Sequence, residues 1–362
     1  MASEKVPPVR LAQAVERVRH HLFRLRQRMA PPPAVMMEMV VGAWVAQAVT
    51  VAAELGVADA LARGPLSAAD LAARVNADQD ALVRLLRALI GVGVFRRRRD
   101  GRYELTPLAD TLRTDAPVSL NGWTRWVGAP QHREHWSHIA GAFRTGKAVI
   151  PQMRGKPAFD WLAGDPELSE IFNQAMTGVS ELSIAPVVAA YDFSPYSTII
   201  DVGGGHGRLL AAILEATPGA TGVLFDLPQV VAGAPELLAK HGVAQRVRIV
   251  EGSFFESVPD GGDAYLMKSV IHDWADDEAV QILRNVRAAA DPGARLLLVE
   301  TVIPGHSRDF AGNWLDLEML VAVGARERTA EEYRRLYDKA GFRLDRIVPT
   351  VSPFSIVEGT AV

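Results

Sequence analysis

Residues Ser197–Gly207 read Ser-Thr-Ile-Ile-Asp-Val-Gly-Gly-Gly-His-Gly, and the fold of the chain follows from this stretch. Thr198–Val202 is small, branched and mostly apolar, which is the pattern of a strand buried on both faces. Three consecutive glycines end the strand, and a helical pattern begins at Arg208. Glycines let the backbone approach a ligand, and the start of a helix offers unpaired N–H groups. The sequence therefore predicts a ligand site in a strand–turn–helix unit.

The spacing of the glycines indicates the class of ligand. Gly203, Gly205 and Gly207 form the pattern G-x-G-x-G, whereas the dinucleotide fingerprint has its third glycine at the position of Arg208. Phe225-Asp226-Leu227 ends the next predicted strand, and Asp226 lies 19 residues after Gly207. A carboxylate at that place can hold the two hydroxyls of an adenosine ribose.

Asp201 comes just before the glycines and adds a negative charge to this turn. Negative charge suits an amine or a sulfonium better than a pyrophosphate. Together with the glycine spacing, it favours S-adenosylmethionine over a nicotinamide dinucleotide as the ligand.

The length, net charge and cysteine content of the chain limit the class of protein it can be. The 362 residues are enough for two domains, and the net charge of −3 shows no basic excess, so nucleic acid is not the expected partner. The absence of cysteine excludes disulfides and thiolate metal sites. The N-terminus lacks the pattern of a signal peptide.

One apolar stretch, Val35–Ala53, is long enough to span a bilayer. Glu38 and Gln47 interrupt it and Glu54 closes it, and charges inside a membrane span are costly. We therefore expect a helix buried in an oligomer interface, and no membrane.

The N-terminal residues predict several helices and a hairpin. Residues 1–30 carry seven Lys or Arg against two Glu on an amphipathic pattern, which we interpret as a mobile or partner-packed arm, with nucleic-acid or membrane binding as the alternative. Residues 34–63 continue as an apolar helix. Ser67 caps a short helix, Gln79–Gly91 forms a second, and a hairpin follows with its turn at Asp100.

This order is a winged-helix pattern, and Arg96–Arg99 in the hairpin suggests DNA binding. Against that function, the second helix is rich in leucine and offers only Arg84 and Arg87 as polar readers of bases. An interaction module is the favoured interpretation, and a ligand-sensing winged-helix regulator is the alternative.

Residues 117–190 look helical and rich in aromatic side chains, in a region that links two domains, where pockets tend to lie. Phe172 and Met176 are four residues apart and share a helix face. From Ser197 onward strands and helices alternate, which predicts a mostly parallel sheet with helices on both faces. The strands are predicted at Ser197–Val202, Gly222–Leu227, Arg246–Phe254, Ala264–Ile271 and Arg295–Val302, with an antiparallel edge hairpin at Phe342–Val348 and Phe354–Glu358.

Six motifs occur in an order that resembles a known family. They are Asp201-Val-Gly-Gly-Gly-His-Gly, Phe225-Asp-Leu-Pro, Gly252-Ser-Phe-Phe, Lys268-Ser-Val-Ile-His-Asp-Trp, Leu297-Leu-Val-Glu and Arg326-Glu-Arg-Thr. The chain resembles the class I S-adenosylmethionine-dependent O-methyltransferases of the plant caffeate and bacterial natural-product type, over most residues from about 35 on. The resemblance implies a Rossmann-like, doubly wound α/β domain at 191–362. It also implies a winged-helix dimerisation domain at 1–120, all-helical apart from the hairpin, and a helical linker at 121–190 that contributes to the substrate pocket.

The resemblance also implies roles for individual residues. The catalytic residues would be His272 as general base, with Glu300 and Glu327 flanking it. The cofactor-binding residues would be Ser180, Asp201, Gly203, Gly205, Asp226, Leu227, Ser253, Phe254 and Lys268. The substrate pocket would include Phe159, Trp161, Phe172, Met176, Asp273, Trp314 and Met319. One departure is Ser253, since the family usually has an acid near the adenine at this position, and we expect weaker fixation of the adenine.

These residues suit methyl transfer to oxygen. The reaction is an in-line displacement at the sulfonium methyl group, and the acceptor hydroxyl must lose its proton. A carboxylate bonded to His272 would raise its basicity and fix its tautomer. A metal site at His272 and Asp273 is disfavoured, because adjacent residues rarely aim at one ion.

The sequence therefore predicts a dimeric, metal-independent, cytoplasmic O-methyltransferase of secondary metabolism, acting on a hydroxylated phenolic or polyketide-like small molecule. Another alternative is a relative that binds the cofactor but catalyses hydroxylation, decarboxylation or rearrangement.

Overall fold

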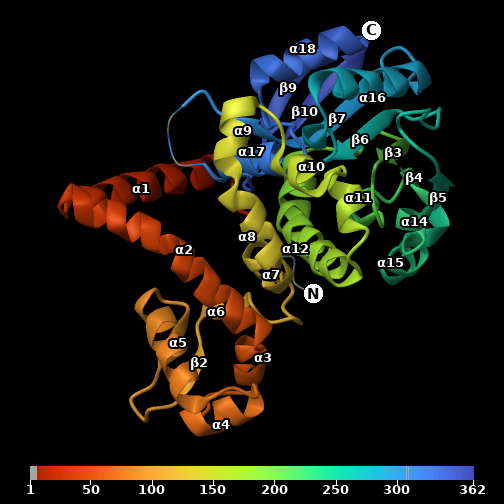
Figure 1. Cartoon of the computed structure of the whole chain (residues 1–362). Coiled ribbons are helices and arrows are strands. Elements are labelled where there is room, and N and C mark those ends of the chain that lie inside the picture. The colour runs from red at the N-terminus through yellow and green to blue at the C-terminus, as the bar shows by residue number, and fades with distance from the viewer. Residues whose placement is uncertain (1–5, 307, 309) are drawn as a thin grey trace. The chain divides into compact units, whose positions relative to one another are not determined.

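The computed structural model describes residues 6–306, 308 and 310–362, and its chain divides into two compact units. One unit joins His21–His138 with Lys156–Leu182. The other joins the segment ending at His20 with Ile139–Gly155 and Ser183–Val362. Figure 1 follows the helices and strands of both units along the chain.

Two long helices open the chain, α1 (Val9–Arg28) and α2 (Pro32–Glu54). The expected single helix over 34–63 is wrong in one respect, because α2 ends at Glu54 and a separate α3 (Val57–Leu61) follows. Gly56 lies between them with φ +65°, a left-handed conformation that glycine adopts at little cost and that ends a helix.

The expected helices and hairpin of the winged-helix pattern are present in the described chain. The Ser67 side chain accepts a hydrogen bond from the Asp70 N–H and caps α4 (Ala68–Arg74), and α5 (Gln79–Gly91) follows. Strands β1 (Phe95–Arg97) and β2 (Tyr103–Leu105) pair antiparallel. The large buried residues on these helices and strands include Leu61, Leu71, Leu82, Leu86, Leu89, Phe95 and Tyr103.

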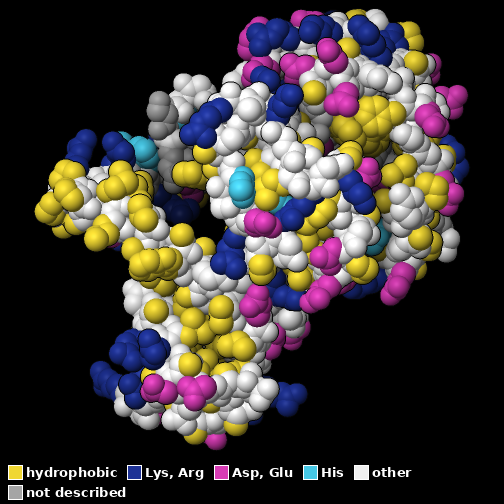
Figure 2. Space-filling view, viewed as in Figure 1, with side chains coloured by type: hydrophobic (Ala, Val, Ile, Leu, Met, Phe, Trp, Pro, Cys, Tyr) yellow, Lys and Arg dark blue, Asp and Glu magenta, His cyan; other side chains and the backbone are white. Residues whose placement is uncertain are grey.

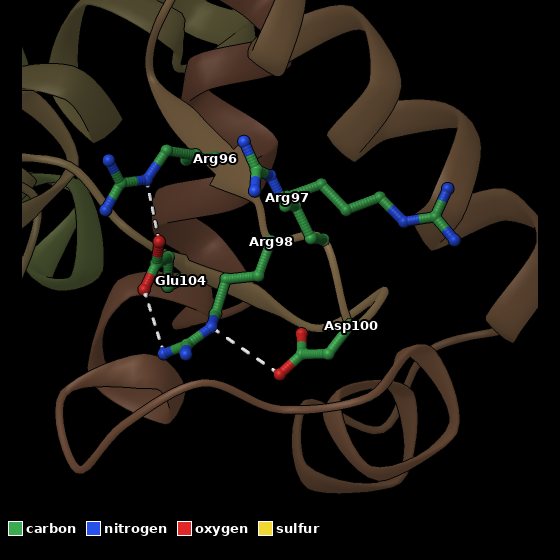
Figure 3. A pocket seen from close by; sticks show the side chains of 6 residues that line it. Arg96, Arg97, Arg98, Asp100 and Glu104 are labelled. Atoms are coloured by element: carbon green, nitrogen blue, oxygen red, sulfur yellow. Dashed lines mark hydrogen bonds and ion pairs between the residues drawn. The ribbon is translucent and has the colours of Figure 1, made fainter.

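The arginine run of the hairpin is partly neutralised by carboxylates of the same hairpin (Figure 3). Arg96 Nε lies 2.7 Å from Glu104 Oε1, and Arg98 Nη1 lies 3.6 Å from the other oxygen of Glu104. Arg98 Nε lies 3.6 Å from Asp100 Oδ2. These side chains line an open surface hollow of about 640 Å³. Two of the four arginines that suggested DNA binding, Arg96 and Arg98, are thus paired with carboxylates.

Short helices complete the unit that begins at His21. They are α6 (Pro107–Asp110), α7 (Asn121–Gly128), α8 (Pro130–Ser137), α11 (Ala158–Leu162) and the first part of α12 (Pro166–Ala190). Helices α2 and α7 pack closely where Thr50 Oγ1 donates to the Thr124 carbonyl oxygen at 3.1 Å. Gly128 allows this approach, since a Cβ there would lie 1.9 Å from Thr50 Oγ1.

The second unit is built on a twisted sheet with strand order β5-β4-β3-β6-β7-β10-β9, and β8 pairs with β7. The strands are β3 (Thr198–Val202), β4 (Thr221–Asp226), β5 (Val247–Glu251), β6 (Ala264–Lys268), β7 (Arg295–Ile303), β8 (Arg328–Thr329), β9 (Phe342–Pro349) and β10 (Phe354–Ala361). Strands β3 to β8 pair in parallel, and β9 and β10 form the expected antiparallel hairpin at the edge. The Rossmann-like fold is confirmed.

Helices cover both faces of this sheet (Figure 1). They are α13 (Arg208–Ala216), α14 (Pro228–Val231), α15 (Ala234–Lys240), α16 (Asp276–Ala289), α17 (Ala311–Ala322) and α18 (Ala330–Ala340), with α9 (Ile139–Thr145) and α10 (Val149–Arg154) packing near α17. Along β3, Ile200 packs into the cluster with α16 and α18, and Ile199 packs into the cluster with α13 and α15. Successive side chains of a strand point to opposite faces, so both must be apolar here.

Three predicted strands end earlier than expected, and the one predicted over Gly222–Leu227 ends one residue early, at Asp226. The strand predicted over Arg246–Phe254 ends at Glu251, because Gly252 begins a turn. The strand predicted over Ala264–Ile271 ends at Lys268, and Ile271–Asp273 forms a short 3-10 helix, η2. Ser269 has φ +53°, which turns the chain out of the sheet. Apolar residues in such a turn cannot be told from strand residues by pattern alone.

Hydrophobic side chains gather on the exposed surface of α1 and α2 (Figure 2). Leu22 of α1 is 59% exposed, and Val40 and Trp44 of α2 are 67% and 74% exposed. By length and composition alone, α2 could also cross a membrane, with a mean hydropathy of 1.6 over its most apolar window. An exposed apolar surface of this kind marks a contact with another molecule.

The glycine turn yields a prediction about stability. A Cβ added at Gly204 would lie 2.6 Å from the Asp201 carboxyl group and 2.6 Å from Leu224 Cδ1, inside the packed sheet. At Gly205 a Cβ would meet nothing within 4 Å, and only the left-handed φ of +61° opposes alanine. We expect Gly205→Ala to lower the free energy of unfolding by ~1 kcal/mol. We expect Gly204→Ala to lower it by more, up to ~3 kcal/mol. Urea denaturation of the two variants measures the difference, and an equal loss in both would contradict it.

Candidate active site

The glycine turn between β3 and α13 forms a cradle of left-handed backbone. Gly203, Gly205 and Gly207 have φ values of +69°, +61° and +80°, and Gly207 caps α13. The Gly203 N–H donates to the Phe225 carbonyl oxygen at 2.8 Å, which ties the turn to the end of β4. The cradle therefore lies at the carboxyl ends of the central strands, where open α/β sheets bind ligands.

Asp226 is the last residue of β4 and contacts this turn. Its Oδ2 accepts a hydrogen bond from the Gly205 N–H at 2.9 Å, and its Oδ1 accepts one from the Leu227 N–H at 2.7 Å. The structure thus brings together three of the residues predicted to bind the cofactor. The carboxylate is fixed in orientation, as a ligand for two ribose hydroxyls should be.

Asp201 lies beneath the turn and is 1% exposed. Burial is the main cause that raises the pKa of its carboxyl group to about 7, and Asp226 adds to the effect while Lys268 opposes it. Lys268 ends β6, and its Nζ lies 5.4 Å from the centroid of the Phe354 ring. The raised pKa weakens the negative charge expected at this turn, because the carboxyl group is then partly protonated near neutral pH.

Ser253 and Phe254 follow β5 on the same side of the sheet. The Ser253 hydroxyl accepts a hydrogen bond from the Phe255 N–H at 3.3 Å, so it stabilises its own turn. The Phe254 ring lies 3.6 Å from the place of a Cβ at Gly203, next to the cradle. Asn285 Nδ2 donates to the Phe254 carbonyl oxygen at 2.8 Å and holds the turn from α16.

His272 lies on η2 and is buried, with 8% of its surface exposed. Its Nδ1 lies 2.8 Å from Glu327 Oε1, and its Nε2 lies 3.6 Å from Asp273 Oδ1. A carboxylate accepts hydrogen bonds, so Nδ1 carries the proton that it donates to Glu327. The neutral ring then has its lone pair on Nε2, the arrangement of a general base held in one tautomer.

Glu300 is fully buried and lies on β7. Its Oε1 accepts hydrogen bonds from the N–H groups of Val270 at 3.1 Å and Ile271 at 2.9 Å. The two glutamates predicted to flank His272 therefore differ in their contacts. Glu327 holds the imidazole ring, and Glu300 holds the backbone that leads to it.

Four ionisable groups share this small buried volume. Burial alone would lower the pKa of His272, but Asp273, Glu300 and Glu327 outweigh it and raise that pKa to about 10. Burial raises the pKa of Glu300 to about 7, and Glu327 adds to this effect while His272 opposes it. Burial also raises the pKa of Asp273. The carboxylates make His272 a much stronger base than a free imidazole.

Three of these four residues, His272, Glu300 and Glu327, are spaced closely enough to bind a metal ion. One ligand atom of each lies within 4.8 Å of the others. However, His272 Nδ1 and Glu327 Oε1 are engaged in a direct hydrogen bond, and Glu300 Oε1 accepts two backbone N–H groups. These contacts engage Oε1 of each glutamate, while Oε2 of Glu300 and Oε2 of Glu327 have no hydrogen-bond partner among the described residues. Metal independence stays a prediction.

The residues predicted to contact the acceptor lie in both units. Phe159 and Phe172 have ring centroids 6.4 Å apart, and Trp161 lies 4.9 Å from the His135 ring in the same unit. Met176 lies on α12 in that unit as well, as does Ser180, which was predicted to bind the cofactor. Asp273, Trp314 and Met319 lie in the unit that holds His272; Trp314 is 64% exposed and Met319 is buried. Their common role in a pocket stays a prediction.

Two residues of this region were missed by the sequence analysis. Arg328 is completely buried beside η2, and Asp316 on α17 accepts a hydrogen bond from the Glu327 N–H at 2.9 Å. The signal for Arg328 was its place directly after Glu327, inside a motif already recognised. Asp316 carried no comparable signal, because its contact joins segments 11 residues apart.

Comparison with known proteins identifies the two parts of the chain. A family model described as an O-methyltransferase domain matches residues 136–343. A second model, an O-methyltransferase dimerisation domain, matches residues 37–115 and supports a homodimer.

Individual relatives agree over nearly the whole chain. The phenazine O-methyltransferase PhzM of Lysobacter antibioticus is 42% identical over 91% of this chain and 96% of its own. The mitomycin biosynthesis 6-O-methyltransferase of Streptomyces lavendulae is 40% identical over 89% of this chain and 92% of its own.

The solved structure of one relative contains two bound ligands. NcsB1 from neocarzinostatin biosynthesis, in complex with S-adenosylmethionine and 2-hydroxy-5-methyl naphthoic acid, is 36% identical, with a TM-score of 0.74 over 88% of this chain and 96% of that chain. The cradle of Gly203 and Gly205, with Asp226 fixed beside it, fits an adenosine ribose. The chain therefore belongs to the O-methyltransferases of secondary metabolism that use S-adenosylmethionine as the methyl donor.

Proposed function

We propose that this enzyme methylates a hydroxyl group of an aromatic or polyketide-like small molecule, with His272 as the general base. The observation that carries the proposal is the hydrogen bond of 2.8 Å between His272 Nδ1 and Glu327 Oε1. It holds the imidazole in the tautomer whose Nε2 accepts a proton. The acceptors of the relatives, a phenazine and a naphthoic acid among them, support an aromatic substrate.

The pKa of His272 matches that of a phenol. A phenol has an ordinary pKa of about 10 and a free imidazole one of about 6.5, so complete proton transfer between them would cost about 5 kcal/mol. The carboxylates around His272 raise its pKa to about 10. Transfer of the phenol proton to Nε2 then becomes nearly thermoneutral, which suits removal of the proton in concert with methyl transfer.

Other parts of the proposal concern the chain's organisation. S-adenosylmethionine supplies an electrophilic methyl group when bound, and the glycine turn, Asp226 and Phe254 would hold its adenosine. We assign residues 1–120 to dimerisation, 121–190 to a linker that contributes to the acceptor pocket, and 191–362 to the catalytic domain. The enzyme would act in the cytoplasm, without nucleic acid or membrane as a partner.

The proposed base is tested with acceptors of graded acidity. We expect His272→Ala to lower turnover of a phenol with a pKa near 10 by about 10²- to 10⁴-fold, because the proton must then leave unaided. An acceptor already ionised at the assay pH should lose far less. Mass spectrometry of a phenolic panel incubated with labelled S-adenosylmethionine measures both. If the variant loses the same factor with every acceptor, His272 positions substrate and is not the base.

The raised pKa of His272 also predicts the pH dependence. The ring must be neutral to accept a proton, and with a pKa of about 10 it is protonated at neutral pH. For an un-ionised phenol, kcat/KM should therefore rise about tenfold per pH unit between pH 7 and 9. Glu327→Gln removes an anionic partner, so its profile should level off at a lower pH and a lower rate. A wild-type profile that is flat over this range would contradict the assignment.

The cofactor site is tested at Asp226. Asp226→Ala removes the acceptor for the ribose hydroxyls and the bond to Gly205, and we expect binding of S-adenosylhomocysteine to weaken by ~1.5–3 kcal/mol. Calorimetry measures the dissociation constant, with Asp277→Ala at the exposed start of α16 as the control. Unchanged affinity in the Asp226 variant would refute its role.

The apolar surface of α2 predicts an obligate dimer through residues 1–120. Trp44 is 74% exposed in the single chain, so burial against a second copy would stabilise the assembly. Sedimentation in detergent-free buffer should show a dimer at micromolar concentration, and Trp44→Asp should shift it toward monomer. Phe143→Asp, at an exposed residue outside this region, is the control. A monomeric wild type would overturn the expectation.

A further inference from the structure

Arg328 is the largest fully buried side chain among the described residues. It lies on β8, which pairs in parallel with β7 at Val302. Removing a guanidinium from water is costly, and the cost is offset only if its donors find acceptors in good geometry. The acceptors that Arg328 uses therefore indicate what the buried charge is for.

Those acceptors lie on both sides of the proposed base. Arg328 Nη1 donates to the Ile271 carbonyl oxygen at 2.8 Å, and Nη2 donates to the Trp274 carbonyl oxygen at 2.8 Å. Nε and Nη2 also donate to Asp276 Oδ1, at 3.0 and 2.9 Å. His272 lies between the two carbonyl groups, one residue after the first and two before the second. The guanidinium thus joins the ends of the turn that carries the base.

Glu300 holds the same turn through its N–H groups. Its Oε1 accepts from Val270 and Ile271, whereas Arg328 donates to the carbonyl groups of Ile271 and Trp274. Glu300 lies on β7 and Arg328 on β8, which are paired strands of the sheet. Backbone donors and acceptors of the turn are therefore both fixed to the sheet by buried ionisable side chains.

Two consecutive residues hold the imidazole ring of His272 and the backbone turn that carries it. Glu327 binds Nδ1 of the imidazole, and Arg328 binds the backbone on either side of it. A displacement of the segment would move both contacts together, so the direction of Nε2 depends on this dipeptide. Misplacement of a reacting group by about 1 Å can cost about 10²-fold in rate.

We propose that Arg328 is a positioning residue, which holds the turn of His272 so that Nε2 points at the acceptor hydroxyl. The inference rests on the proposed role of His272 as the base. Lysine cannot replace arginine here, because one ammonium group lacks the planar fork that reaches two carbonyl groups and a carboxylate at once.

The test is Arg328→Lys, which keeps the charge and loses the fork. We expect kcat for a phenol with a pKa near 10 to fall about 10- to 100-fold. The acceptor KM and the affinity for S-adenosylhomocysteine should stay within about threefold of wild type, which also shows that the variant folds. Arg334→Lys is the matched control, because Arg334 is exposed and its ion pair with Glu331 lies on the surface of α18. It should leave kcat unchanged.

A double-mutant cycle separates positioning from a general structural role. If Arg328 acts through His272, Arg328→Lys should cost almost nothing further in a His272→Ala background. The same loss in both backgrounds, or no loss in the single variant, would overturn the proposal. Should Arg328→Lys fail to fold, the second variant is Asp276→Asn, which removes the negative charge of the half-exposed partner of Arg328. It should give a smaller loss of kcat, and that loss should likewise disappear in a His272→Ala background.

The outcome is distinguishable from failure of the proposed function. If His272→Ala loses the same factor with every acceptor, the base assignment fails, and the positioning role falls with it. If His272→Ala behaves as expected and the cycle is additive, only the role of Arg328 fails.

Discussion

The hydrogen bond between His272 and Glu327 is the interaction on which the proposed chemistry depends. Both groups are buried, and a charge in such a place is stable only beside an opposite charge or a good hydrogen-bond partner. The surrounding carboxylates raise the pKa of His272 to about 10, which would give the proposed base a basicity close to that of a phenolate. Without them, burial would lower the pKa of His272 and weaken the base.

Building such a site requires a rigid support. Like charges repel, so the carboxylates of Glu300 and Glu327 must be held in place by other contacts. The backbone N–H groups of Val270 and Ile271 hold the Glu300 carboxylate. The Glu327 carboxylate is held by His272 Nδ1, and the Glu327 backbone N–H is bonded to Asp316. Both glutamates extend from segments paired to the central sheet, whose strands are buried on both faces. A rigid sheet therefore keeps the two glutamates at fixed positions relative to His272.

The residues predicted to bind the cofactor are easier to recognise from the sequence. Three left-handed glycines shape the turn, and Asp226 is bonded to it through the Gly205 N–H. These residues are close in sequence or at the ends of neighbouring strands, so a local pattern reveals them. The acceptor end is different, because its predicted residues are spread over helices of both units. Aromatic side chains at helical spacing are equally suited to a core and to a pocket, and local pattern does not separate the two.

The sequence by itself determined the strand–glycine–helix unit, the alternation of strands and helices, and the edge hairpin, because short-range periodicity and glycine placement dictate these features. Its order of motifs also determined the family. Tertiary structure decided where β6 ends, since apolar residues of the turn at Ile271 look like strand residues in sequence. It also decided that Glu327 binds the ring while Glu300 binds the turn, and that Arg328 is buried beside them. These contacts join residues 29 to 57 positions apart, and only the pairing of β7 with β6 and β8 brings them together.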